Sequence, residues 1–174
     1  MHAIQLFSGS YFDYHKPEDS DVSIEDIAHA LSHVCRFAGH VSEFYSVAQH
    51  CVNISFIVRD LHAYDALLHD TAEAFTNDIP TPLKIAVPEF KMIETKIETA
   101  MSERFEFTYP LSDAVKLADL QMLKLEKEAL KPNADSWPML EDVNVEGLHE
   151  RVDLDCWSPA YAKHRFLKRY WEVV

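Results

Sequence analysis

LLHDTAEAFTNDIPTPLK, at residues 67–84, places charged side chains on a segment that starts like a buried helix. His69 and Asp70 follow an apolar leucine pair, and Glu73 lies one helical turn further along the same face. Asp78 then precedes the proline-rich stretch IPTP, which is typical of a helix stop. An imidazole and several carboxylates on one helix form a site only if other parts of the chain supply partners.

The length and composition indicate one globular domain over residues 1–174, with 1–22 as an N-terminal arm. The chain is 48% hydrophobic and 26% charged, as is usual for a soluble protein. No run of eighteen apolar residues predicts a membrane span, and the N-terminus lacks the basic start and apolar run of a signal peptide. We therefore expect no membrane partner.

The cysteines indicate the redox environment of the protein, and the net charge indicates which ligands it can bind. Cys35, Cys51 and Cys156 are odd in number and have no close pairs, which favours a reducing, cytoplasmic setting. The net charge of −13 opposes binding to a polynucleotide, because such binding needs clustered Lys and Arg. A small anion remains a suitable partner if a few cations or a metal converge on it.

Long segments with a 3.6-residue apolar period and only three glycines predict an all-α fold. Ser23 and Asp26 form a capping-box pattern at the start of the first expected helix, which we expect to end at Gly39. The other helices are expected from about Ser46, over 62–75, from Pro88 through Met101, over 111–129, and from Ser158 with Pro159 at its first position.

Two segments do not follow the helical period. In the N-terminal arm, Ile4 and Leu6 alternate with polar neighbours before SGS and YFDY, which predicts either a short hairpin or an extended arm. Residues 132–156 are acidic and lack clean periodicity. A segment of this length inside a compact domain is typical of a long loop or a lid.

Two polar side chains on other expected helices are candidate partners for His69 and Asp70. His50 lies beside the apolar stripe of the second helix, and Asp119 lies among apolar side chains of the fifth, where an unpaired carboxylate is costly. Two His and two Asp give a mixed nitrogen and oxygen set that suits Mn²⁺, Co²⁺, Fe²⁺, Ni²⁺ or Zn²⁺. Taken singly, His50 could be an ordinary core or surface histidine, and Asp119 could be a solvated carboxylate or pair with Lys116.

The order His50, His69-Asp70, Asp119 on successive helices resembles the HD-domain metal-dependent phosphohydrolases. CRF, YSVAQHC, LLHDTAEAFTNDIPTPLK and KLADLQML more narrowly resemble the bacterial 5′-deoxynucleotidases and the phage-type deoxynucleoside triphosphohydrolases, which are dATPase-like. The likeness spans about residues 23–130 and implies an HD-type helical bundle. It also implies a homo-oligomer, either a dimer or a larger ring.

The resemblance assigns a role to each matching residue. His50, His69, Asp70 and Asp119 would hold one divalent transition metal, and Glu73 would orient or deprotonate the attacking water. A bound metal lowers the pKa of water and neutralises phosphoryl oxygens, and a carboxylate can accept the proton of that water.

Three further residues match the substrate side of such a site. Arg36 would grip the phosphate next to the sugar, since arginine suits bidentate phosphate contacts. Asp78 would lie near the deoxyribose and the leaving oxygen. Phe37 stands where the relatives have tryptophan, so the aromatic face is kept but the indole N–H is lost.

Lys84 and Lys116 bear on which phosphates are cut. Either could reach a β- or γ-phosphate, with Mg²⁺ as an additional ion on the substrate phosphates, or each could be an ordinary surface lysine. We therefore expect a phosphohydrolase acting on small-molecule 2′-deoxynucleotides, either as a nucleotidase or as a triphosphohydrolase. The rival hypotheses are hydrolysis of another phosphoester, such as an alarmone or a cyclic nucleotide, a non-catalytic nucleotide sensor, and a metal-free helical scaffold.

Overall fold

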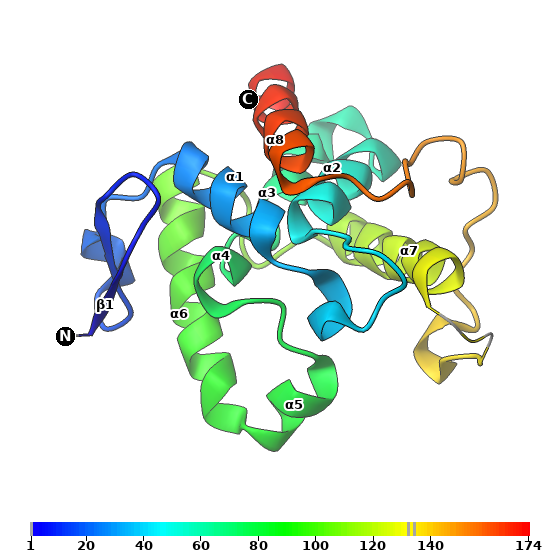
Figure 1. Ribbon diagram of the computed structural model, residues 1–174, viewed down its shortest axis with the longest axis horizontal. Helices are drawn as coiled ribbons and strands as arrows, with labels where there is room; N and C mark the ends of the chain where they lie inside the picture. The colour runs from blue at the N-terminus through cyan, green and yellow to red at the C-terminus, as the bar shows by residue number, and fades with distance from the viewer. Residues whose placement is uncertain (1, 132, 134) are drawn as a thin grey trace.

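Helices make up most of the chain in the computed structural model, which describes residues 2–131, 133 and 135–174 (Figure 1). This confirms the all-α fold class. The elements are β1 (Ala3–Gln5), β2 (Tyr11–Asp13), α1 (Ile24–His33), α2 (Val47–Ile57), α3 (Ala63–Leu68), α4 (Glu73–Thr76), α5 (Thr81–Ala86), α6 (Pro88–Phe105), α7 (Asp113–Leu130) and α8 (Pro159–Val173), with short 3₁₀ turns η1 (Pro17–Asp19), η2 (Arg36–Gly39), η3 (Asp60–His62) and η4 (Pro138–Leu140). None of the helices in the described part of the chain is both long and apolar enough to cross a bilayer.

The N-terminal arm is a hairpin and not an extended segment. β1 and β2 pair antiparallel, with Ile4 opposite Phe12. Phe12 is fully buried and stacks on Phe75 with a centroid distance of 3.7 Å. This aromatic contact attaches the hairpin to the helical core, because a two-stranded hairpin alone has little stability in water.

The first helix begins as expected but ends earlier. The Ser23 hydroxyl accepts a hydrogen bond from the Asp26 N–H at 3.1 Å, and the Asp26 carboxylate accepts one from the Ser23 N–H at 3.1 Å, which confirms the capping box. The expected end at Gly39 is wrong, since α1 ends at His33. Beyond it the Arg36 N–H donates to the Tyr45 carbonyl at 2.9 Å, so a long-range backbone pairing replaces the helical hydrogen bonds.

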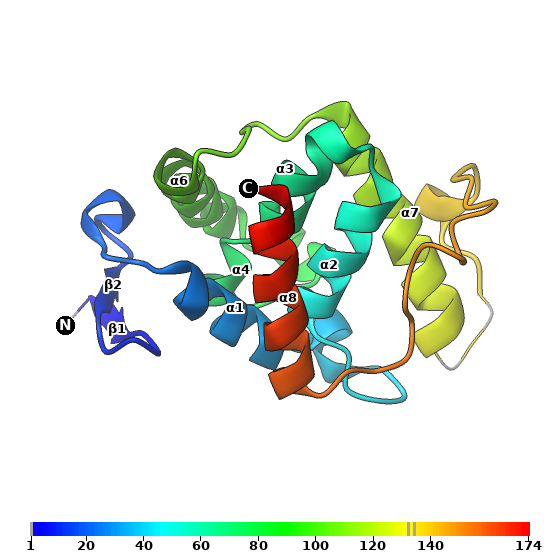
Figure 2. The ribbon, with the colours of Figure 1, turned by 90° about the horizontal axis from the view of Figure 1, so that it is seen from above.

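The second helix, α2, lies at the centre of the fold. It starts after the N-cap Ser46, as expected, and packs against α1, α3, α7 and α8 (Figure 2). Its buried polar side chains find partners in the segment before α8. Gln49 donates to the carbonyls of Asp153 and Asp155, and Asn53 donates to the carbonyl of Asp153.

The expected helix over 62–75 is interrupted. Between α3 and α4 the hydrogen bonds run from residue i to i−3, with the Thr71 N–H donating to Leu68 at 3.0 Å and the Glu73 N–H donating to Asp70 at 2.9 Å. In such tight turns the side chains at i and i+3 point the same way, so Asp70 and Glu73 share one direction. The stop expected at IPTP is also only local, because α5 begins at Thr81 with a proline in its first turn.

The segment between α7 and α8 contains one 3₁₀ turn, η4, and otherwise runs as loop and turns in its described residues. Residues 132 and 134 of the expected loop, like residue 1 of the arm, lie outside the described residues. Lys124 on α7 donates to the carbonyls of Leu140 and Val143 at 3.1 and 2.8 Å, which holds this segment against the helix. A lid function for residues 132–156 stays a prediction.

Candidate metal centre

Three helical segments bring His50, His69, Asp70 and Asp119 together. His50 lies on α2, His69 and Asp70 follow α3, and Asp119 lies on α7. The Nε2 atom of His50 is 3.1 Å from Oδ1 of Asp119 and 3.6 Å from Oδ2 of Asp70. The Nε2 atom of His69 is 3.1 Å from Oδ2 of Asp70 and 4.0 Å from Oδ1 of Asp119.

Both histidines are held by their other ring nitrogen. Nδ1 of His50 donates to the Glu126 carboxylate at 2.7 Å, and Nδ1 of His69 donates to the Ala66 carbonyl at 2.8 Å. Their buried Nε2 atoms have no hydrogen-bond partner among the described residues. In a neutral imidazole whose Nδ1 carries the proton, Nε2 has a free lone pair, as a metal-ligating histidine requires.

The electrostatics of the cluster also favour a cation. Burial opposes a positive charge on His69, but the neighbouring Asp70 carboxylate and Cys51 outweigh burial and raise the His69 pKa well above its usual value. His50, His69 and Asp119 offer ligand atoms within 4.8 Å of one another, as do Cys51, His69 and Asp70. Burial raises the pKa of Cys51 to about 11, so its thiol stays protonated and the His and Asp set fits a metal better.

Glu126 also belongs to this group of buried charges, although the sequence analysis does not single it out. Its fully buried carboxylate hydrogen-bonds His50 through one oxygen and accepts from Nη2 and Nε of Arg36 at 2.9 and 3.2 Å through the other. Burial raises the pKa of Glu126, but the charges of Arg36 and His50 outweigh that effect and lower it. Its position seven residues after Asp119 on α7 places it on the same helix face, which was the available signal.

Arg36 and Asp78 lie beside the cluster, on the turn η2 and on the loop after α4. Arg36 is only 7% exposed, and its Nη1 lies 3.9 Å from Oδ2 of Asp78. The same Asp78 oxygen accepts a hydrogen bond from the Phe37 N–H at 3.1 Å. Phe37 and Ala38 have φ values of 56° and 52°, a left-handed conformation that bulky residues rarely adopt and that is common at functional sites.

Glu73 is a buried carboxylate close enough to Asp70 to feel its charge. Its Oε2 atom has no hydrogen-bond partner among the described residues, and its Oε1 atom is 3.9 Å from Nζ of Lys84. Burial, together with the charges of Asp70 and Asp78, raises the pKa of Glu73 well above its usual value. A carboxylate with a raised pKa is a better proton acceptor than a solvated one.

The two lysines are placed differently. Lys84 on α5 reaches toward Glu73 but forms its close ion pair with Glu94, at 2.6 Å, and Glu94 also pairs with Lys91 at 3.0 Å. Lys116 lies on an exposed part of α7, with Nζ 3.8 Å from Asp113. Of the two, the structure brings Lys84 to the cluster, and the role given to Lys116 stays a prediction.

Comparison with known proteins gives the family. Residues 27–131 match the family described as 5′-deoxynucleotidase YfbR-like, and this protein belongs to that family. The Escherichia coli (strain K12) protein named "Uncharacterized protein YfdR" is 42% identical over 171 residues, which are 98% of this chain and 94% of the relative. The Rhodobacter capsulatus protein named "Uncharacterized protein RCAP_rcc00048" is 32% identical over 144 residues, 72% of this chain and 71% of the relative. By its description, the family is one of phosphate-ester hydrolases.

Proposed function

We propose that this protein is a divalent-metal-dependent 5′-deoxynucleotidase of the HD superfamily, which releases phosphate and the deoxynucleoside from a 2′-deoxynucleotide. One observation supports this most directly. Two buried imidazole nitrogens without hydrogen-bond partners among the described residues face two carboxylates, and an arginine lies beside them. This arrangement suits an ion and the phosphate that it would neutralise.

His50, His69, Asp70 and Asp119 would hold a single transition metal, of the set Mn²⁺, Co²⁺, Fe²⁺, Ni²⁺ and Zn²⁺. When bound, such an ion lowers the pKa of water and offsets the negative charge of the phosphoryl oxygens. Glu126 orients His50 through Nδ1 and thereby fixes the tautomer that leaves Nε2 free. Mg²⁺ would accompany the substrate phosphates.

Glu73 would accept the proton of the attacking water. Its side chain points the same way as Asp70 because of the tight turns between them, and its buried Oε2 atom has no hydrogen-bond partner among the described residues. Burial and the charges of Asp70 and Asp78 raise its pKa, which makes the carboxylate a stronger proton acceptor than a solvated one. An intact Glu73 counts against a non-catalytic sensor, which needs metal ligands but no proton acceptor.

Arg36, Phe37 and Asp78 would bind the substrate. Glu126 occupies the Nε and Nη2 side of the Arg36 guanidinium, which leaves Nη1 to contact a phosphate. Phe37 offers its aromatic face to the base or sugar. Asp78 fixes the Phe37 backbone and would lie near the leaving oxygen of the deoxyribose.

The lysines favour a monophosphate over a triphosphate as substrate. The Lys84 ammonium is close to Glu94 and Glu73, and the Lys116 ammonium is close to Asp113. A triphosphate would have to compete with these carboxylates for both lysines. The triphosphohydrolase reaction, with Lys84 and Lys116 on the β- and γ-phosphates, is the second candidate.

A product assay with deoxy- and ribonucleotide mono- and triphosphates in Mn²⁺, Co²⁺ and Mg²⁺ tests the proposal. We expect phosphate and deoxynucleoside from the deoxynucleoside monophosphates. Release of intact triphosphate from deoxynucleoside triphosphates would support the second candidate instead. Binding of deoxynucleotides without hydrolysis under any of these metals would overturn both and leave a sensor.

A further inference from the structure

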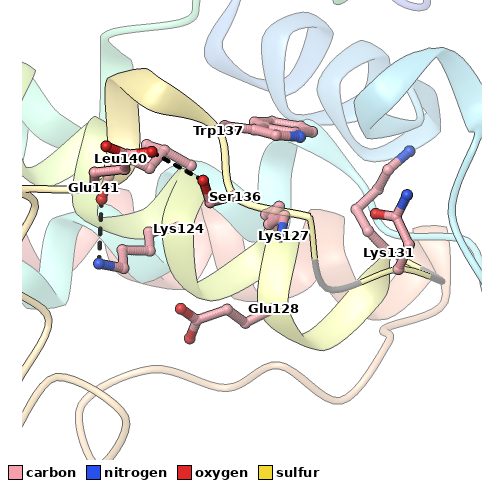
Figure 3. A pocket seen from close by; sticks show the side chains of 9 residues that line it. Lys124, Lys127, Glu128, Lys131, Ser136, Trp137, Leu140 and Glu141 are labelled. Atoms are coloured by element: carbon pink, nitrogen blue, oxygen red, sulfur yellow. Dashed lines mark hydrogen bonds between the residues drawn. The ribbon is translucent and has the colours of Figure 1, made fainter.

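A separate cavity of about 610 Å³ lies between the C-terminal half of α7 and the loop that carries η4 (Figure 3). This volume is within the usual range for small-molecule sites. Its lining includes none of the four candidate metal ligands, nor Glu73, Arg36 or Asp78. The cavity is therefore distinct from the candidate metal centre.

Three lysines of α7 line the cavity. Lys124, Lys127 and Lys131 are spaced three and four residues apart, which places them on one helix face. Such a group of ammoniums is a local exception in a chain whose net charge is −13. The carboxylates of Glu128 and Glu141 also line the cavity, so the three lysines and two glutamates give its lining a net charge of +1.

Lys127 is the most informative of these residues. It is only 7% exposed, and its ammonium has no hydrogen-bond or ion-pair partner among the described residues. The stem of this side chain is covered while the residue still lines the cavity, so its ammonium is available to an anionic ligand there.

The other two lysines are held in place and still have donors available. Lys124 donates to two backbone carbonyls, and Lys131 donates to the carbonyl of His40 at 2.6 Å. Each ammonium has three N–H donors. Lys124 thus keeps one N–H and Lys131 keeps two for a ligand.

An aromatic surface completes the cavity. Figure 3 shows the half-buried indole ring of Trp137 above Lys127, with Lys131 reaching up beside it. The ring centres of Trp137 and Phe37 are 6.3 Å apart, and the Lys131 ammonium lies 5.4 Å from the centre of the same Phe37 ring. Aromatic side chains stack on nucleobases, and nearby ammoniums bind phosphates.

We propose that this cavity binds a nucleoside di- or triphosphate, with the base on Trp137 and the phosphates on Lys127, Lys124 and Lys131. Several ammoniums facing one space match a ligand with several negative charges better than a monophosphate. This second site goes beyond the proposed hydrolysis and does not depend on it. Phe37 lies near both places, since the centre of its ring is 6.3 Å from that of Trp137 and 5.4 Å from the Arg36 guanidinium.

Calorimetric titration of the protein in the presence of a chelator tests this site without metal or turnover. ATP and dATP are the probes, and tripolyphosphate and adenosine are their separate parts. We expect saturable binding of one ATP per chain and at least a tenfold loss of affinity in Lys127→Met, which keeps the alkyl stem and removes the charge. Lys168→Met is the matched control, because Lys168 on α8 has a mostly exposed side chain far along the chain from the cavity.

Trp137→Ala provides a second variant on the loop, outside the helix. It should weaken ATP and leave tripolyphosphate binding unchanged, because only the base contacts the indole. Absence of saturable ATP binding to the wild-type protein would overturn the proposal. So would equal losses in Lys127→Met and Lys168→Met, or an unchanged ATP affinity in both Lys127→Met and Trp137→Ala.

Discussion

The helices α2 and α5 both contribute to the candidate site, but their surroundings are opposite. Ten of the eleven residues of α2 are buried, including His50, and its polar side chains are hydrogen-bonded to other segments. α5 has no buried residue, and its apolar Leu83 and Ile85 face solvent. Lys84 is its link to the site.

The difference shows which part of the candidate site is held rigidly in position. A buried polar group must be paired, and pairing from several sides sets the position of His50 to within a narrow range. The exposed α5 has no such constraint beyond the ion pairs of Lys84. We therefore expect changes around α2 and α7 to act on metal and catalysis, and changes on the surface of α5 to act on neither.

Removal of a metal ligand should have the largest effect. Asp70→Ala should lose bound metal and lower activity by about 10³-fold or more, because a catalytic metal contributes several kcal/mol to the transition state. Metal analysis of the purified variant and its turnover rate measure both effects. Asp113→Ala, at the exposed start of α7, is the control and should keep both. Full metal content in Asp70→Ala would remove this residue from the ligand set.

Replacement of the proton acceptor should separate catalysis from metal binding. Glu73→Gln keeps the shape of the side chain but removes its basicity, so turnover should fall by about 10² to 10⁴ while metal remains bound. Steady-state kinetics and metal analysis check this, with Glu103→Gln on the exposed face of α6 as the control. Wild-type turnover in Glu73→Gln would mean that another group, with Asp78 the nearest candidate, takes the proton.

Replacement of Glu126, which links α7 to His50 on α2, should have an intermediate effect. Glu126→Gln keeps one hydrogen-bond acceptor but loses the charge that orients His50 and pairs with Arg36. Metal affinity should weaken by about 10- to 100-fold, the usual result of losing a partner behind a metal-ligating histidine. A metal titration measures it, and the exposed Glu128→Gln, two residues further on, should not change it. Equal metal affinity in both variants would contradict the positioning role of Glu126.

A pair of isoleucines tests the comparison directly. Ile54→Ala on α2 should lower the free energy of unfolding by about 2–5 kcal/mol, because it opens a cavity in the core. Ile85→Ala on α5, where the side chain is 74% exposed, should change it by less than about 0.5 kcal/mol. Denaturant unfolding compares the two variants. A similar loss in both would mean that α5 is covered in the native assembly.

Most helix starts could be predicted because their signals are local. Ser23, Ser46 and Ser158 each accept a hydrogen bond from the N–H three residues on, and that geometry depends only on the neighbouring chain. The end of α1 could not be predicted in this way. It depends on the pairing of residues 34–36 with residues 45–47, for which the helix pattern gives no sign.

The residues of the candidate site could be predicted from the sequence only in part. His50, His69, Asp70 and Asp119 are chemically distinct from the apolar stripes around them, so their spacing and their resemblance to a known order marked them as candidates. α5 departs from the stop that IPTP predicts, because Pro82 lies in the first turn of a helix, where proline is well suited. The cavity beside Lys127 had no sequence signal beyond the spacing of three lysines on α7.

The sequence by itself determined the all-α class, the helix starts and the residue types that suit a divalent metal, because caps, periodicity and ligand chemistry are properties of short segments. The tertiary structure decided that Glu126 contacts both His50 and Arg36, the latter ninety residues before it in the chain. It decided as well that Lys84 reaches Glu73 while Lys116 pairs with Asp113. It also decided which lysines of α7 line one cavity. Which buried charges meet depends on how helices pack against one another, and that packing is set by the whole core at once.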